Sequence, residues 1–217
     1  MISHAHRCVF VHIPKCGGQS VERIFIEDCG LTWESRAPLI LRPNDNPDAG
    51  PPRLAHLTYR DYLRYGYADE ALMREYFVFS VVRNPYARVL SLYRYLRYDS
   101  SMSFAEFVID VLCWQVKNKG DMCWFMSPQF EYVCDAKGFV GIDQWVRLEE
   151  IDEKLPPLLQ KVGVSVSEIP RANKTRVRRM AAEGVADIAE DDGWNPDLKA
   201  RVFSVYEPDF FHFGYAR

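Results

Sequence analysis

The sequence lacks any long apolar run. A membrane-spanning helix needs about 18 or more apolar residues in succession, whereas the densest apolar stretch, residues 76–82 (YFVFSVV), is only long enough for a buried strand. The apolar stretch at residues 8–13 is too short for a signal sequence and contains a histidine. We therefore expect a cytoplasmic protein without a stable membrane span; trimming of an anchor from a longer chain is the alternative.

Cysteine motifs and an excess of positive charge are lacking as well. The six cysteines form no C-x-x-C pair and have no histidine at zinc-finger spacing, so we expect reduced thiols, no disulfide framework and no metal site. The 27 Lys and Arg residues are outnumbered by 30 Asp and Glu residues, which gives a net charge of −3. This balance argues against a nucleic-acid partner but is compatible with a local basic site for a small polyanion.

What the sequence does have is the composition of an ordinary globular chain. Hydrophobic residues make up 48% and charged residues 26% of the 217 positions, which predicts a single domain, 1–217. Short β-prone runs alternate with helical patterns, and this alternation predicts an α/β fold with a central, mostly parallel sheet flanked by helices. The predicted strands are residues 8–12, 76–82 and 141–148. Which side chains of the last strand face inward is not predicted.

Helices are predicted where periodic apolar residues follow local start signals. The Asn84-Pro85 pair and the capping box that begins at Ser103 are two such signals. The expected helices cover residues 19–29, 60–76 in part, 85–98, 103–116, 151–162 and a final stretch after 195–196 that ends near 206–208. The helix at 151–162 is expected to be interrupted near Pro156-Pro157, because proline removes a helical N–H donor.

The segment 11–20 (VHIPKCGGQS) combines features that bind anions. Its two glycines let backbone N–H groups turn towards a ligand, and the helix that starts at Gln19 directs its positive end to the same place. Lys15 adds a positive charge and Ser20 a hydroxyl donor. The arrangement predicts a phosphate cradle, in preference to a tight turn with an exposed lysine.

The order of residues in this loop differs from that of ATP- and GTP-binding loops. A Walker A loop places its lysine after the glycines and follows it at once with Ser or Thr, whereas Lys15 precedes the glycines here. No evident aspartate at the end of a strand offers itself as a Mg²⁺ ligand. A metal-dependent nucleoside triphosphate site is therefore not predicted.

A second segment, 79–91 (FSVVRNPYARVLS), points to the same kind of ligand. Arg83 follows directly after a predicted buried strand, and the carboxyl ends of parallel strands are where α/β folds bind ligands. Ser91 lies about two turns into the next helix and can face back towards the strand end. The two side chains could share one phosphate, although a structural ion pair explains Arg83 alone and ordinary helix packing explains Ser91 alone.

Together, the two segments resemble those of the sulfotransferases that use 3′-phosphoadenosine-5′-phosphosulfate (PAPS). The closest likeness is to carbohydrate O-sulfotransferases with an H-I-P-K-T-G-G-T-S loop and a V-R-N-P-Y-x-R-x-x-S segment. Weaker likenesses occur at residues 128–138 (PQFEYVCDAKG), 146–151 and 209–215. The resemblance implies a P-loop-like three-layer fold and direct, in-line transfer of a sulfuryl group from PAPS to a hydroxyl acceptor, a carbohydrate in the most similar group, without a metal.

The resemblance also implies roles for individual residues. The 5′-phosphosulfate of PAPS, and the same end of the product adenosine 3′,5′-bisphosphate, would be held by Lys15, Cys16, Gly17, Gly18, Gln19 and Ser20. The 3′-phosphate would be bound by Arg83 and Ser91, and Lys174 would belong to a late nucleotide-binding loop. Cys16 departs from the threonine of the family motif, and its place near a positive helix start suggests a lowered thiol pKa as a hypothesis.

A catalytic base is implied within residues 54–61 (LAHLTYRD), where related enzymes carry a histidine between the two phosphate motifs. His56 matches that place, and a neutral imidazole suits removal of a proton from an attacking hydroxyl. Lys15 would stabilise charge on the leaving phosphate oxygen. His12, at the end of the first strand, is the rival base; its alternative role is to orient a ligand or to pack.

Other interpretations stay open from the sequence. A P-loop-like kinase acting on a small hydroxyl substrate and a non-catalytic nucleotide- or glycan-binding module are the alternatives to an enzyme of this family. The basic run 171–179 is equally compatible with a lid and with a solvated surface, and Trp114, Trp124 and Tyr132 are candidates either for stacking on a ligand or for the core. Neither the regiochemistry of the acceptor nor the oligomeric state is predicted.

Overall fold

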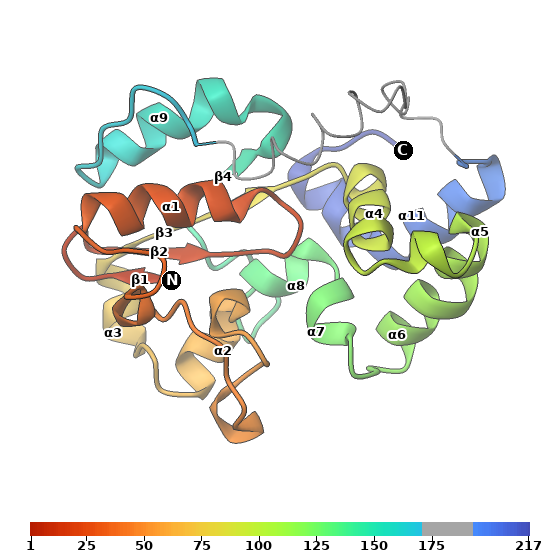
Figure 1. Cartoon of the computed structure of the whole chain (residues 1–217), viewed down its shortest axis with the longest axis horizontal. Coiled ribbons are helices and arrows are strands. Elements are labelled where there is room, and N and C mark those ends of the chain that lie inside the picture. Colours follow the sequence, from red (N-terminus) through yellow and green to blue (C-terminus); the bar gives the residue numbers. More distant parts are fainter. Residues whose placement is uncertain (171–192) are drawn as a thin grey trace.

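The computed structural model describes residues 1–170 and 193–217, and its centre is a four-stranded sheet (Figure 1). The strand order is β1 (Ile2–Ser3), β2 (Cys8–Val11), β3 (Phe77–Val82), β4 (Gln144–Arg147). β1 is antiparallel to β2, whereas β2, β3 and β4 are parallel to one another. The predicted mostly parallel sheet is therefore confirmed, with one short antiparallel strand added at its edge.

Helices cover both faces of the sheet and make the three-layer, P-loop-like α/β architecture (Figure 1). One face carries α1 (Gly18–Asp28) and α9 (Ile151–Lys161), and the other carries α2 (Tyr59–Arg64), α3 (Glu70–Glu75) and α8 (Gln129–Val133). The alternation of side chains along β2 explains this burial on two sides. Cys8 and Phe10 pack with α1 and α9, whereas Val9 and Val11 pack with the opposite helices.

A group of helices to one side of the sheet forms a third apolar cluster (Figure 1). Its helical segments are α4 (Pro85–Tyr95), α5 (Phe104–Glu106), the π-helical segment η5 (Phe107–Leu112), α6 (Cys113–Lys117), α7 (Cys123–Met126) and α11 (Pro196–Phe213). The short 3₁₀ segments are η1 (Ala37–Leu39), η2 (Pro47–Ala49), η3 (Leu54–His56), η4 (Tyr98–Ser100) and η6 (Leu148–Glu150). None of the helices in 1–170 or 193–217 is both long and apolar enough to cross a membrane.

Two helix predictions involve proline, and one of them is wrong. α9 is not interrupted at Pro156-Pro157 but continues to Lys161, because three buried leucines (Leu155, Leu158, Leu159) hold it against the sheet. The first helical stretch of α11 ends near 206, within the predicted boundary at 206–208, but the prediction missed the stretch that follows. Tyr206 leaves the helical conformation (φ −111°, ψ 20°), and a second helical stretch follows in which Pro208 lies near the start, where a missing N–H costs little.

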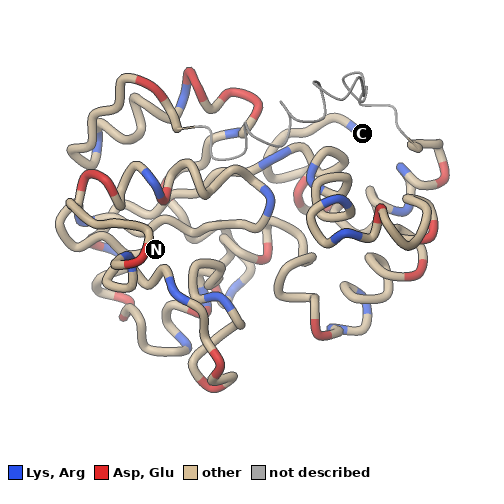
Figure 2. Tube along the Cα trace, viewed as in Figure 1, with Lys and Arg blue, Asp and Glu red and all other residues tan. Residues whose placement is uncertain are grey.

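The structure also settles which side chains of the last strand face inward. Val146 is buried at 2% exposure, whereas Trp145 is 36% exposed. Charged residues of both signs are interspersed along the described trace (Figure 2). The predicted absence of a broadly basic surface is consistent with that distribution.

Candidate functional site

The phosphate-cradle segment forms the turn between β2 and α1. Gly17 has φ 78°, which favours glycine, and Lys15 has φ 68°, a conformation rarely adopted by residues with a side chain. Among the described residues no side chain caps the start of α1, and its first turn contains no acidic residue. Its first N–H groups are therefore directed towards this loop without a competing carboxylate, as an anion site requires.

The three residues after Gly17 differ in how they contribute to the turn. Gly18 is buried, and a Cβ atom on it would lie 2.1 Å from Cδ2 of His12, so the imidazole packs directly on the glycine backbone. Gln19 is exposed and Ser20 is half-buried in the first turn of α1. Both therefore lie at the positive end of the helix, as the sequence predicted.

The structure brings the second predicted motif against this loop. Arg83 follows β3 and donates from Nη1 to the carbonyl oxygen of Lys15 over 3.3 Å. The Lys15 ammonium lies 3.8 Å from the centre of the Tyr95 ring, at the end of α4. Lys15 and Arg83, which are 68 positions apart in the sequence, thus contribute positive charge to one place.

Arg88 is a site residue that sequence analysis missed. It is 1% exposed and donates to three carbonyl oxygens: Nε to Pro14 (2.9 Å), Nη1 to Ser127 (2.9 Å) and Nη2 to Phe125 (3.2 Å). It therefore supports the loop from within the protein. The only sequence signal was its position inside the 79–91 segment.

Ser91 lies between Arg88 and Tyr95 on α4, at spacings of three and four residues. Residues at these spacings share one helix face. Since Arg88 contacts Pro14 and Tyr95 contacts Lys15, Ser91 is on the face that meets the loop. Within the part of the chain that the structure describes, Ser91 and Arg83 make no hydrogen bond to each other.

His56 is placed beside the same loop by η3. It is 8% exposed, and its Nδ1 lies 3.0 Å from the carbonyl oxygen of His12. A carbonyl oxygen can only accept, so Nδ1 carries the proton and Nε2 retains its lone pair. Burial and the neighbouring His12 hold the pKa of His56 well below its usual range, although the hydrogen bond to the carbonyl acts in the opposite direction. His56 is therefore a neutral imidazole whose Nε2 can accept a proton, although less readily than in an exposed histidine.

His12 has a different set of partners. Its Nδ1 lies 2.6 Å from Oε1 of Glu22, a residue of α1, and both side chains are buried. Burial alone would raise the pKa of Glu22, but the interactions with His12, the N-terminal ammonium and Arg36 together lower it. The His12 ring also lies 4.5 Å, centre to centre, from the His56 ring. His12 thus connects β2, α1 and η3 at the base of the loop.

Comparison with known proteins identifies the family. A family model described as the sulfotransferase family matches residues 1–216. The chain belongs to the sulfotransferase family. Searches of curated proteins and of solved structures found no match. Membership makes the chain a transferase of sulfuryl groups that requires a hydroxyl acceptor, and it accounts for the cradle and the converging basic residues.

Cys16 of this sulfotransferase does not have the reactive thiol that its position suggested. Its side chain is fully buried, and Sγ donates to Oε1 of Gln129 over 3.1 Å. Burial raises the pKa of the thiol to about 12, and the nearby Arg88 and Arg83, which act to lower it, do not compensate. The hypothesis of a lowered pKa is wrong because the thiol is buried against Gln129.

A small cavity of about 90 Å³ adjoins His56 in the sulfotransferase. It is lined by Pro51, His56, Thr58, Arg60, Asp61, Trp124, Ser127, Glu131 and Tyr132. Trp124 lies 6.0 Å from the His56 ring, whereas Tyr132 is 1% exposed and donates its hydroxyl to the Trp124 carbonyl. Of the aromatic candidates, Tyr132 therefore belongs to the core and Trp124 borders the site. A larger hollow of about 810 Å³ along residues 63–76 includes none of the predicted site residues.

Lys174 and the basic run 171–179 lie outside the described residues. Within the described residues, no group of three or more His, Cys, Asp or Glu side chains is arranged to hold a metal ion.

Proposed function

We propose that this chain transfers the sulfuryl group of PAPS to a hydroxyl of a carbohydrate, with His56 as the general base. The observation that carries the proposal is the hydrogen bond from His56 Nδ1 to the His12 carbonyl (3.0 Å). It fixes the tautomer and leaves Nε2 able to take a proton next to a loop built for an anion. A positioned general base contributes about 10²–10⁴-fold to rate, and the lowered pKa of His56 favours the lower part of that range.

The residues of the loop suit the phosphate groups of the donor. The start of α1 and Lys15 would hold the 5′-phosphosulfate, and Arg83 with Ser91 would hold the 3′-phosphate that distinguishes PAPS from ATP. Support for this division comes from the hydrogen bond of Arg83 to the Lys15 carbonyl and from the place of Ser91 on the loop-facing side of α4. PAPS supplies the activated sulfuryl group.

In the transfer step, the acceptor oxygen forms a bond to sulfur as the bond from sulfur to the phosphate oxygen breaks. His56 Nε2 takes the proton of the acceptor hydroxyl. Lys15 and the N–H groups of the loop stabilise the negative charge that develops on the leaving phosphate oxygen; one such donor is worth about 3–4 kcal/mol. His12 is a positioning residue in this scheme, because its Nδ1 is bound to Glu22 and its carbonyl orients His56.

A carbohydrate acceptor is supported by the likeness of the two phosphate motifs to carbohydrate O-sulfotransferases and by Trp124 beside His56. An indole face suits the apolar face of a sugar ring, while Asp61 and Glu131, which line the same cavity, offer carboxylates to sugar hydroxyls.

Two experiments test the proposal. Calorimetric titration with adenosine 3′,5′-bisphosphate, ADP and ATP in metal-free buffer should show binding of the bisphosphate in preference to the other two. A Mg²⁺-dependent preference for ATP would favour a kinase instead. His56→Ala should retain bisphosphate binding and lose transfer from PAPS, with His4→Ala as the control for a histidine remote from the loop. Full activity of His56→Ala would remove this residue from the mechanism.

A further inference from the structure

Gln129 is the first residue of α8, and both polar atoms of its side-chain amide form hydrogen bonds inside the protein. It is fully buried. Oε1 accepts from the backbone N–H of Arg83 (2.8 Å) and from Sγ of Cys16 (3.1 Å), and Nε2 donates to the backbone carbonyl of Arg83 (2.8 Å). The Gln129 side chain therefore holds the backbone N–H and carbonyl groups of Arg83, which is proposed to bind one phosphate. It also holds the Cys16 thiol of the loop that is proposed to bind the other phosphate.

Asp209 of α11 fixes the direction of this amide. Its Oδ2 accepts from both the backbone N–H and Nε2 of Gln129, at 2.9 and 3.1 Å, and its Oδ1 accepts from the N–H of Phe130 (2.8 Å). A carboxylate only accepts, so the amide nitrogen must face Asp209 and the amide oxygen must face Arg83 and Cys16. If the amide were reversed, its oxygen would face the Asp209 carboxylate and its N–H groups would face the backbone N–H of Arg83.

Capping of α8 explains only part of this arrangement. Asp209 accepts hydrogen bonds from two backbone N–H groups at the start of α8, and any acidic capping residue would satisfy these groups. The four contacts of the Gln129 amide group are not needed for a cap. They join three segments that are far apart in the sequence: the loop at Cys16, the end of β3 at Arg83 and helix α11.

We propose that Gln129 and Asp209 are positioning residues that set the spacing between the phosphate loop and Arg83, and thereby make the site selective for a nucleotide with both a 5′- and a 3′-phosphate. The inference rests on the proposed donor site. If the spacing were free to vary, Arg83 could not hold the 3′-phosphate while the loop holds the 5′-end, and the bisphosphate would lose its advantage over a 5′-monophosphate.

The test compares the Kd of adenosine 3′,5′-bisphosphate with the Kd of adenosine 5′-monophosphate for each protein. Burial raises the pKa of Asp209 to about 6, so titrations are run above that pH, where the carboxylate accepts all its hydrogen bonds. Gln129→Met keeps the length of the side chain and removes its polar contacts. We expect the selectivity for the bisphosphate to fall by about ten-fold, chiefly through weaker binding of the bisphosphate.

Asp209→Asn is the second variant and decides the question if Gln129→Met does not fold. Its selectivity should fall in the same direction. Tyr206→Phe is the matched control: it lies on the same helix and loses a buried hydrogen bond, from its hydroxyl to the Met126 carbonyl (2.7 Å), that does not involve Gln129. It should lower the Tm and leave the selectivity unchanged.

The possible failures are distinguishable. Wild-type protein that prefers the bisphosphate, together with a folded Asp209→Asn variant that keeps the same preference, would overturn the positioning role alone. An equal loss of selectivity in Tyr206→Phe would also overturn it, because general loosening would then explain the effect. Wild-type protein with no preference for the bisphosphate would overturn the donor site and this inference together.

Discussion

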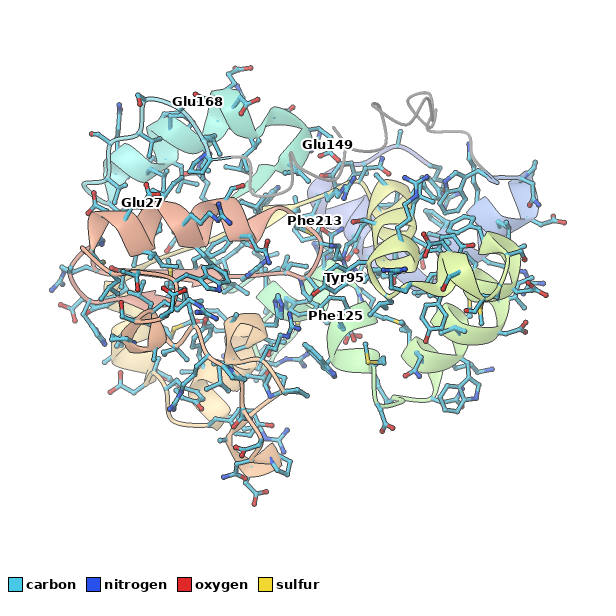
Figure 3. The ribbon with its side chains drawn as sticks, in the orientation of Figure 1. Glu27, Tyr95, Phe125, Glu149, Glu168 and Phe213 are labelled. Carbon is cyan, nitrogen blue, oxygen red and sulfur yellow. The ribbon has the colours of Figure 1, made fainter. Side chains whose placement is uncertain are left out.

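The ammonium group of Lys15 lies 3.8 Å from the centre of the Tyr95 ring, and the Tyr95 hydroxyl accepts a hydrogen bond from Arg53 over 3.2 Å. The ring also stacks on Phe125 at 5.6 Å, and Figure 3 shows the two side chains next to each other. Phe125 in turn lies 5.7 Å from the His56 ring. An aromatic pair therefore lies between the lysine of the loop and the histidine proposed as the base.

Replacement of Tyr95 tests whether this ring holds Lys15 for the reaction. A cation–π contact at a partly exposed site is worth about 0.5–1 kcal/mol, so Tyr95→Leu should lower kcat/KM for sulfuryl transfer by a few-fold. Tyr95→Phe keeps the ring and loses the contact with Arg53, and it should stay close to wild type. Steady-state kinetics of both variants give the comparison; equal losses would assign the effect to Arg53 instead of the ring.

The pH dependence of the reaction should reflect the low pKa of His56. An imidazole acts as a base only when neutral, and the pKa of His56 lies well below its usual range. The contribution of His56 to the kcat/KM profile should therefore stay flat as the pH falls through 6.5 and decline only at distinctly lower pH. Protonation of Asp209, whose pKa burial raises to about 6, should weaken donor binding before that. A decline centred near 6.5 in the wild-type profile would contradict the assignment of His56 as the buried base.

Gly18→Ala should disturb the site by steric contact alone. The backbone of Gly18 has no positive φ, but the new Cβ would lie 2.1 Å from Cδ2 of His12. Displacement of His12 would move the carbonyl that orients His56, so transfer should fall together with the Tm. Gly30→Ala is the control: it has φ 65° and no atom within 4 Å of the new Cβ, so it carries only the backbone cost of about 1 kcal/mol. Similar activity in the two variants would argue against the His12 contact.

Loss of Arg88 should destabilise the protein strongly. Its side chain is 1% exposed and satisfies the carbonyl oxygens of Pro14, Phe125 and Ser127. Arg88→Met would leave all three without this donor, and we expect a loss of about 3 kcal/mol or more in the free energy of unfolding, measured by urea denaturation. Arg201→Ala, at an exposed position of α11, should change stability by less than about 0.5 kcal/mol. A small effect of Arg88→Met would show that water replaces the guanidinium.

The parts of the fold that were predictable depend on local chemistry. Asn84, Ser103 and Asn195 each accept a hydrogen bond from a backbone N–H at the start of the expected helix, because such caps act within three residues. The buried strands followed from their apolar residues. The loop between β2 and α1, and the place of Arg83 at the end of β3, were each predicted from residues that are close together in the sequence.

The features that the sequence did not predict depend on partners that are distant in the sequence. Cys16 is turned inward by Gln129, which lies 113 positions away, so its environment could not be inferred from the loop. The three carbonyl partners of Arg88 come from segments up to 74 positions away. α9 passes through two prolines because its leucines pack on the sheet, an energetic contribution that no local rule contains.

The left-handed backbone of Lys15 sets the stability of this loop against the charge that the proposed reaction needs. A side chain at φ 68° costs roughly 1 kcal/mol relative to glycine. Lys15→Gly would therefore remove the proposed catalytic charge and relieve the backbone at the same time. Selection for thermal stability alone would favour glycine at this position; on the proposed function, the lysine is a point where the chain gives up stability for chemistry.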